Sequence, residues 1–235
     1  MSNVDKYIKL NFSFIKGEII GLLCCTIFAS VGIFMPTVAI LVLVLLVAMI
    51  VLVVRVYSKI YSKTLFDEGA VLYQSLPFSS SEIVVAKTFV VTVATMITMV
   101  GLMGGLIVGL AVINLTVKEP ELLTGTLDLI GAIGPAGAAL MIFRLLTQSF
   151  FWASIFFASF AVFKTTKELA DRLLMTAMFV AVLTFQSDYL SEFTTILIGT
   201  NIAAASIVEI LVNALLGIGA CLITKYYLDN KYIVK

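Results

Sequence analysis

Six long apolar runs limit what this chain can fold into. They span approximately residues 19–35, 37–54, 88–113, 140–163, 173–190 and 202–224. A helix needs roughly 20 apolar residues to cross a hydrocarbon core of about 30 Å, because lipid cannot satisfy exposed backbone amides and carbonyls. The sequence therefore predicts an all-α integral membrane protein with six transmembrane helices.

The segments between these runs are short, and the longest polar interruption covers residues 55–87. Hydrophobic residues make up 61% of the chain and charged residues only 12%, against about 25% charged residues in ordinary soluble domains. We therefore expect residues 1–235 to form a single transmembrane domain surrounded by membrane lipids. The net charge of +1 gives no indication of a nucleic-acid partner.

The positions of the basic residues predict the orientation. If both termini are cytoplasmic, every lysine and arginine except Lys118 and Arg144 falls in an inner segment. Acidic residues gather in the outer segments, at Glu119, Glu121, Asp128, Asp188 and Glu192. This asymmetry obeys the positive-inside rule, so we expect both ends of the chain to be cytoplasmic.

Two connections on the outer side are less clear from sequence. Pro36, between the first two runs, favours a tight helical hairpin, because proline lacks the amide donor that continues a helix. The outer segment 114–139 is rich in glycine and mildly apolar, and 191–201 is similar. Each is compatible with an ordinary loop or with a segment that dips into the outer leaflet.

The inner segment 55–87 carries two helix signals. Apolar residues recur at helical spacing from Leu65 to Leu76, which predicts an amphipathic helix on the membrane surface. Pro77 ends that helix, because the residue before a proline avoids helical geometry. Ser79 and Glu82 then form an S-x-x-E capping box, so a new helix should start at about Ser80. A capped connector is the plainest interpretation.

These same residues resemble a known family. Glu68-Gly69, the run from Leu72 through Gln74, Ser75, Leu76 and Pro77 to Ser79, and the run from Glu82 to Ala86-Lys87 are similar to the inner-loop pattern of bacterial ABC-2 type transporter permeases. That pattern reads approximately Leu, a small or polar residue, Leu-Pro, a hydrophobic residue, Ser-Arg, Ile-Val and Ala-Lys. Here Ser80 or Ser81 stands where the basic residue is common.

The resemblance implies a permease subunit in the bacterial cytoplasmic membrane. It implies a second permease subunit, identical or homologous, and two separately encoded ATPase subunits that bind ATP and Mg²⁺. The inner loop would carry a coupling helix that docks on the ATPase, and the matching positions are Glu68, Leu72, Tyr73, Leu76, Pro77, Ser79 and Glu82. No glycine precedes Lys-Ser or Lys-Thr, so the chain has no P-loop and we expect it to be neither an enzyme nor a cofactor carrier.

Polar and small residues inside the runs are candidates for a conduit or for packing. Gly101, Gly105 and Gly109 recur every four residues and predict close helix packing. The candidate conduit residues are Thr92, Thr95, Met99, Glu209 and Asn213. An intramembrane acid such as Glu209 is a functional candidate by default, and pairing with Arg144 is open.

Two functions therefore compete. The first is a permease that exports an amphipathic molecule, such as an antimicrobial peptide, a lipid-like molecule or a drug. The second is a self-contained secondary transporter or channel driven by an ion gradient through Glu209. A non-transporting scaffold or immunity protein has no positive feature in the sequence.

Overall fold

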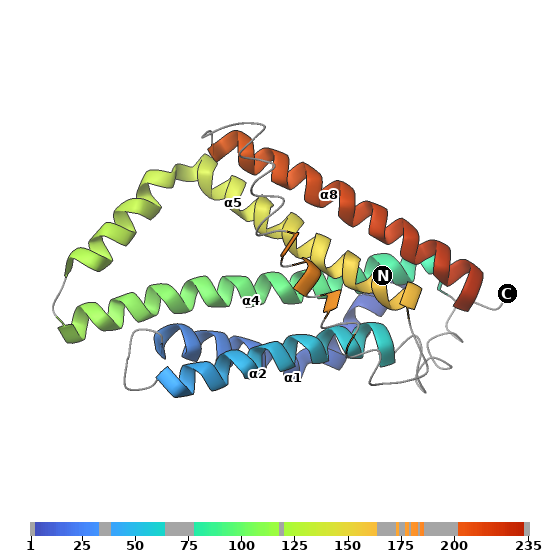
Figure 1. Ribbon diagram of the computed structural model, residues 1–235, viewed down its shortest axis with the longest axis horizontal. Helices are drawn as coiled ribbons and strands as arrows, with labels where there is room; N and C mark the ends of the chain where they lie inside the picture. The colour runs from blue at the N-terminus through green and yellow to red at the C-terminus, as the bar shows by residue number, and fades with distance from the viewer. Residues whose placement is uncertain are drawn as a thin grey trace.

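The protein is almost entirely helical in the computed structural model (Figure 1). The structure describes residues 3–32, 39–63, 78–117, 120–163 and 202–232, together with residues 173, 177, 178, 180–182, 184 and 185. Apart from Phe78 and Ser79, each of these residues is helical. Four of the described helices are long and apolar enough to cross a membrane, with the apolar segments Val4–Ala29, Ser80–Gly101, Gly134–Val162 and Ala203–Asn230. The chain is thus an all-α, multi-pass membrane protein.

The first two helices form an antiparallel hairpin. Helix α1 covers Asn3–Gly32, and α2 covers Ala39–Tyr57 and continues as a π-helix, η2, over Ser58–Lys63. A Cβ on Gly21 would lie 3.3 Å from the side chain of Leu52, and Glu18 pairs with Lys59 at 2.5 Å. The hairpin agrees with the expectation from Pro36, although Pro36 itself lies outside the described residues.

Helix α4, Ser80–Val117, lies along α1 and runs in the same direction. Lys87 meets Asn11 near the start of both helices, and Gly101 meets Thr26 further along. A Cβ on Gly101 would lie 2.9 Å from the Thr26 hydroxyl, so the glycine permits the close approach that the sequence predicts. Gly105 and Gly109 lie further along α4, beyond the described side chains.

Helix α5 covers Pro120–Phe163 and bends at Gly134 (Figure 1). Gly134 has φ +64°, a backbone conformation open to glycine and costly for other residues, and Pro135 cannot donate to the preceding turn. The interpretation of 114–139 as an ordinary loop is therefore wrong. Both flanks of the connection at residues 118–119 are helical, because the segment's leucines and alanines favour a helix that its glycines bend rather than end.

Helix α8, Ile202–Tyr227, packs along α5 and continues as the π-helix η4 over Leu228–Tyr232. Glu209 pairs with Arg144, Gly217 faces Phe150, and Cys221 meets Ser154. These pairs occur in the same order along both helices, so α5 and α8 run parallel. Within the predicted span 173–190, the structure describes residues 173, 177, 178, 180–182, 184 and 185, and each of them is helical.

Several described helices extend beyond the predicted membrane spans. The first span was placed at 19–35, whereas α1 begins at Asn3, because Tyr7, Asn11 and Ile15 bury one face of its first half. The second span was ended at residue 54, whereas the helix reaches Lys63, so residues 55–63 are part of the bundle rather than a loop. Helix α4 begins at Ser80 as predicted.

Aromatic side chains fill the core where α2, η2 and α5 meet. The Tyr61 ring stacks on Phe157 with centroids 4.4 Å apart, and Tyr57 meets Phe156 edge-on at 4.8 Å. Both tyrosines are fully buried, so each hydroxyl needs a partner inside the bundle. Both ends of the described chain lie at this end of the bundle (Figure 1).

Candidate functional site

The clearest candidate site is the point where the 64–77 segment leaves and rejoins the helical bundle. We call it the loop base. It consists of Tyr7, Asn11, Ile60, Tyr61, Phe78, Ser79, Ser80, Glu82, Lys87 and Asp229.

A capping box starts α4, as the sequence predicts. The Ser79 amide donates to the Glu82 carboxylate at 2.8 Å, and the Glu82 amide donates to the Ser79 hydroxyl at 3.3 Å. The Ser79 hydroxyl also donates to the Glu82 carboxylate at 2.9 Å. The reciprocal bonds satisfy amides that have no partner within the first turn, so the chain direction is fixed immediately after the loop.

Both ends of the chain hold the residues beside this cap. The Phe78 ring packs against Tyr7 of α1 with centroids 4.7 Å apart. The Ser80 hydroxyl donates a short hydrogen bond to the Asp229 carboxylate in η4. The start of α4 is therefore attached to elements from the first and last parts of the sequence.

Lys87 connects the two sides of the loop base. Its side chain is fully buried, and its ammonium donates to the Ile60 carbonyl of η2 at 2.5 Å and to the Asn11 side-chain oxygen at 3.5 Å. It also lies 5.6 Å from the centre of the Tyr7 ring. Carbonyls near the end of a helix lack helical partners and carry partial negative charge, which makes Ile60 a suitable acceptor for a buried cation.

Tyr61, the next residue of η2, anchors the same side to α5. Its hydroxyl donates to the Ala153 carbonyl at 3.0 Å, while its ring stacks on Phe157. Lys87 in α4, which follows the 64–77 segment, is thus bonded to Ile60 in η2, which precedes it, and Tyr61 is bonded to α5. A force on the segment would meet a rigid support.

The sequence identified only part of this site. Glu68, Leu72, Tyr73, Leu76 and Pro77 lie outside the described residues, so their coupling role stays a prediction. Lys87 was assigned to the cytoplasmic side and to the family pattern, but its burial was not predicted. A signal was present, because Ile83, Lys87 and Val91 are spaced by four and share one apolar helix face.

The candidate conduit residues divide into two places. Thr95 and Met99 line a cleft between α4 and α5, together with four residues that the sequence did not indicate: Leu145, Gln148, Ser149 and Trp152. Glu209 and Asn213 lie on α8 against α5 and do not line that cleft. Thr92 is buried, and its hydroxyl has no hydrogen-bond partner among the described residues. The five residues therefore do not all line this cleft, and their role as a conduit stays a prediction.

Glu209 is paired rather than free. Its carboxylate lies 2.5 Å from the Arg144 guanidinium, and its side chain is 13% exposed. One turn further along α8, Asn213 is buried, and its side-chain oxygen has no hydrogen-bond partner among the described residues. The ion pair neutralises the most costly charge in the sixth apolar run, which the sequence left open.

Neither a group of metal-binding side chains nor a similar known protein indicates a function for the described part of the chain. Within the described part of the chain, no group of three or more Asp, Glu or Cys side chains lies close enough to hold a metal ion. Comparison with protein-family models, with curated proteins and with solved structures finds no match.

Proposed function

We propose that this chain is the membrane-spanning permease subunit of an ATP-driven exporter in a bacterial cytoplasmic membrane. Two copies, or one copy and a homologue, would assemble with two ATPase subunits that dock on the 64–77 segments. The cargo is an amphipathic molecule such as a peptide, a lipid-like molecule or a drug. The observation that carries the proposal is the loop base, where both ends of an inner loop are locked into the bundle.

The helix directions support the six-span topology of such a subunit. Helices α1 and α4 run one way, whereas α2, α5 and α8 run the other. One further span between Phe163 and Ile202 makes six alternating crossings. Both ends of the chain would then be cytoplasmic, on the side that the basic residues indicate.

The loop base also offers a mechanism for coupling. Helix α4 begins directly after the loop and carries Thr95 and Met99 of the cleft. A displacement of the 64–77 segment by a docked ATPase would be passed to α4 through the capping box and Lys87, since neither side of the base can move alone. The chain has no P-loop, so the ATP-driven movement has to come from a partner.

The test is coupling between ATP hydrolysis and transport. The tagged chain is purified from its native membrane, the P-loop ATPase that accompanies it is identified by mass spectrometry, and the complex is reconstituted in nanodiscs. Leu76→Arg with Pro77→Ala should leave insertion intact while abolishing the change in ATPase rate on assembly. Ser13→Arg, which adds the same charge at an exposed position of α1, is the matched control.

Two results would contradict the proposal. The first is unchanged ATPase stimulation by the Leu76→Arg/Pro77→Ala variant. The second is ATP-independent transport by the purified chain alone in liposomes, which would favour a secondary transporter. The pairing of Glu209 with Arg144 counts against that alternative, because the carboxylate already has a cationic partner.

A further inference from the structure

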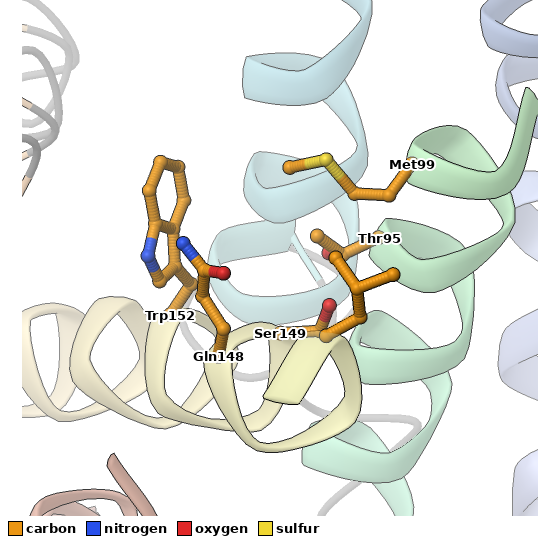
Figure 2. Close-up of a pocket in the computed structure, with 6 residues that line it drawn as sticks. Thr95, Met99, Gln148, Ser149 and Trp152 are labelled. Carbon is orange, nitrogen blue, oxygen red and sulfur yellow. The ribbon is translucent and has the colours of Figure 1, made fainter. Parts of the chain in front are cut away.

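The cleft between α4 and α5 lies near the middle of the apolar segment Gly134–Val162. Figure 2 shows Met99 extending from α4 toward α5, while Gln148 and Trp152 rise side by side from α5. Thr95 and the buried Ser149 lie deeper between the two helices. Hydrogen-bonding side chains from two helices therefore meet at a depth where lipid offers no hydrogen bonds.

The lining chemistry is specific. The described residues around the cleft supply two hydroxyls, one amide and one indole N–H beside a thioether and a leucine, and none of them is charged. The cavity volume is about 10 Å³, so one oxygen or nitrogen atom of a larger polar group can enter it. Such a site suits one small, neutral group that both donates and accepts hydrogen bonds.

The cleft is also connected to the loop base. The Thr95 hydroxyl donates to the Val91 carbonyl at 2.9 Å and lies 3.3 Å from the Tyr57 hydroxyl. Tyr57 is only three residues before Ile60, the acceptor of the Lys87 ammonium. A shift of the loop base would therefore reach the floor of the cleft through one turn of helix.

We propose that this cleft is a recognition site for one uncharged hydroxyl or amide group of an amphipathic cargo, whose apolar part remains in the surrounding lipid. Gln148 and Thr95 would bind the polar group, and Met99 would adapt to the chain beside it. Charged head groups would be rejected, because none of the described residues that line the cleft carries a countercharge to replace their hydration. The inference rests on the proposed function in one respect, namely that the chain moves an amphipathic molecule.

Trp152 makes the inference directly measurable, since it is the only tryptophan of the chain. The purified protein in phosphatidylcholine nanodiscs is titrated with four undecyl amphiphiles brominated at carbons 4 and 5, which end in a hydroxyl, a primary amide, a carboxylate or a trimethylammonium group. Bromine quenches tryptophan emission on contact. After correction for partition into lipid, the two neutral probes should quench saturably, with at least about fivefold higher affinity than the charged probes, as expected for one hydrogen bond.

Three variants locate the binding group. Gln148→Leu and Thr95→Val should each lower the affinity for the neutral probes by about fivefold, which is the effect of losing one hydrogen bond. Gln148→Glu should shift the preference toward the cationic probe. Thr147→Val is the matched control, because Thr147 donates to its own helix at Phe143 and Arg144 and does not line the cleft.

The result that would overturn the site is equal quenching by all four probes, or saturable quenching that Gln148→Leu and Thr95→Val leave unchanged. The unfolding midpoint identifies a variant that fails to fold. If Gln148→Leu fails to fold, Gln148→Glu still tests the site, because it keeps the side-chain volume. The assay contains no ATPase. A negative result would therefore contradict only the proposed role of the cleft, whereas a negative result in the coupling experiment would contradict the proposed exporter.

Discussion

Helix α5 contacts α8 near Arg144, Glu209 and Asn213, and we call this contact the seam. The loop base and the seam differ in how their buried polar groups are bonded. At the loop base, Lys87 and Tyr61 are fully buried, and each donates to a backbone carbonyl of another helix. At the seam, the Arg144 side chain is 47% exposed, and the buried Asn213 retains an unpartnered oxygen among the described residues. Hydrogen bonds to buried backbone are expensive to break, whereas exposed ion pairs contribute little.

The two regions therefore suit different tasks. A base in which Lys87 and Tyr61 are each bonded to a backbone carbonyl of another helix suits the role of a lever. The seam lies beside the bend at Gly134, where glycine permits a change of helix direction. We infer that rearrangement during transport would start at the seam and that force would enter at the base.

The largest effect on stability is expected when the charge of Lys87 at the loop base is reversed. Lys87→Glu would place an unpaired carboxylate against the Ile60 carbonyl and the negative end of η2. We expect the free energy of unfolding to fall by about 3–5 kcal/mol, the usual effect of an uncompensated buried charge. Thermal unfolding in detergent, followed by the loss of helical circular dichroism, measures it.

Lys16→Glu is the control for that prediction, because Lys16 is exposed on α1 and the charge change is identical. The unfolding midpoint of Lys87→Met should fall between those of Lys87→Glu and Lys16→Glu. Methionine keeps the apolar stem but leaves the Ile60 carbonyl without the Lys87 side chain as its donor. Equal midpoints for Lys87→Glu and Lys16→Glu would show that the base is not the rigid end.

The sequence predicted the local features of the loop base and missed its long-range ones. The capping box at Ser79 and Glu82 and the helix start at Ser80 depend on residues within four positions, so pattern alone locates them. The burial of Lys87 depends on Asn11 and Ile60, and the anchoring of Ser80 depends on Asp229. Such partners are set by helix packing, which no local pattern specifies.

The candidate conduit shows the same division. Of the candidate conduit residues on α4, Thr95 and Met99 line the cleft, whereas the residues on its α5 side were not among the candidates. Gln148, Ser149 and Trp152 are spaced within about one helical turn in an apolar run, a signal that spacing analysis could have used. The sequence left the pairing of Glu209 with Arg144 open, because the two residues lie far apart along the chain.

A medium effect is expected where α8 packs most closely on α5. A Cβ on Gly217 would lie 2.5 Å from the Phe150 ring, whereas a Cβ on Gly219 meets nothing within 4 Å. We expect Gly217→Ala to lower the free energy of unfolding by about 1–3 kcal/mol through overpacking. Gly219→Ala should be neutral or stabilise slightly, because alanine favours the helix.

These two glycines sharpen the comparison because they differ in one contact on the same helix. The same detergent unfolding assay compares them. Adding Phe150→Leu to the Gly217→Ala variant should restore part of its stability, because the ring that meets the new Cβ is removed. If Gly217→Ala were as stable as Gly219→Ala, the seam would be loose along its whole length rather than only near Arg144.

The smallest effect is expected at the ion pair itself. Glu209→Gln and Arg144→Met should each lower the free energy of unfolding by no more than about 1 kcal/mol, because the arginine is half exposed and remains partly hydrated. A double-mutant cycle isolates the pair, and its coupling energy should shrink as salt is raised from low to physiological concentration. A coupling energy as large as the effect of Lys87→Glu would remove the distinction between the two regions. Transport in the Glu209→Gln variant then separates the functions, since an ATP-driven exporter should retain it whereas a transporter that moves ions through Glu209 should lose it.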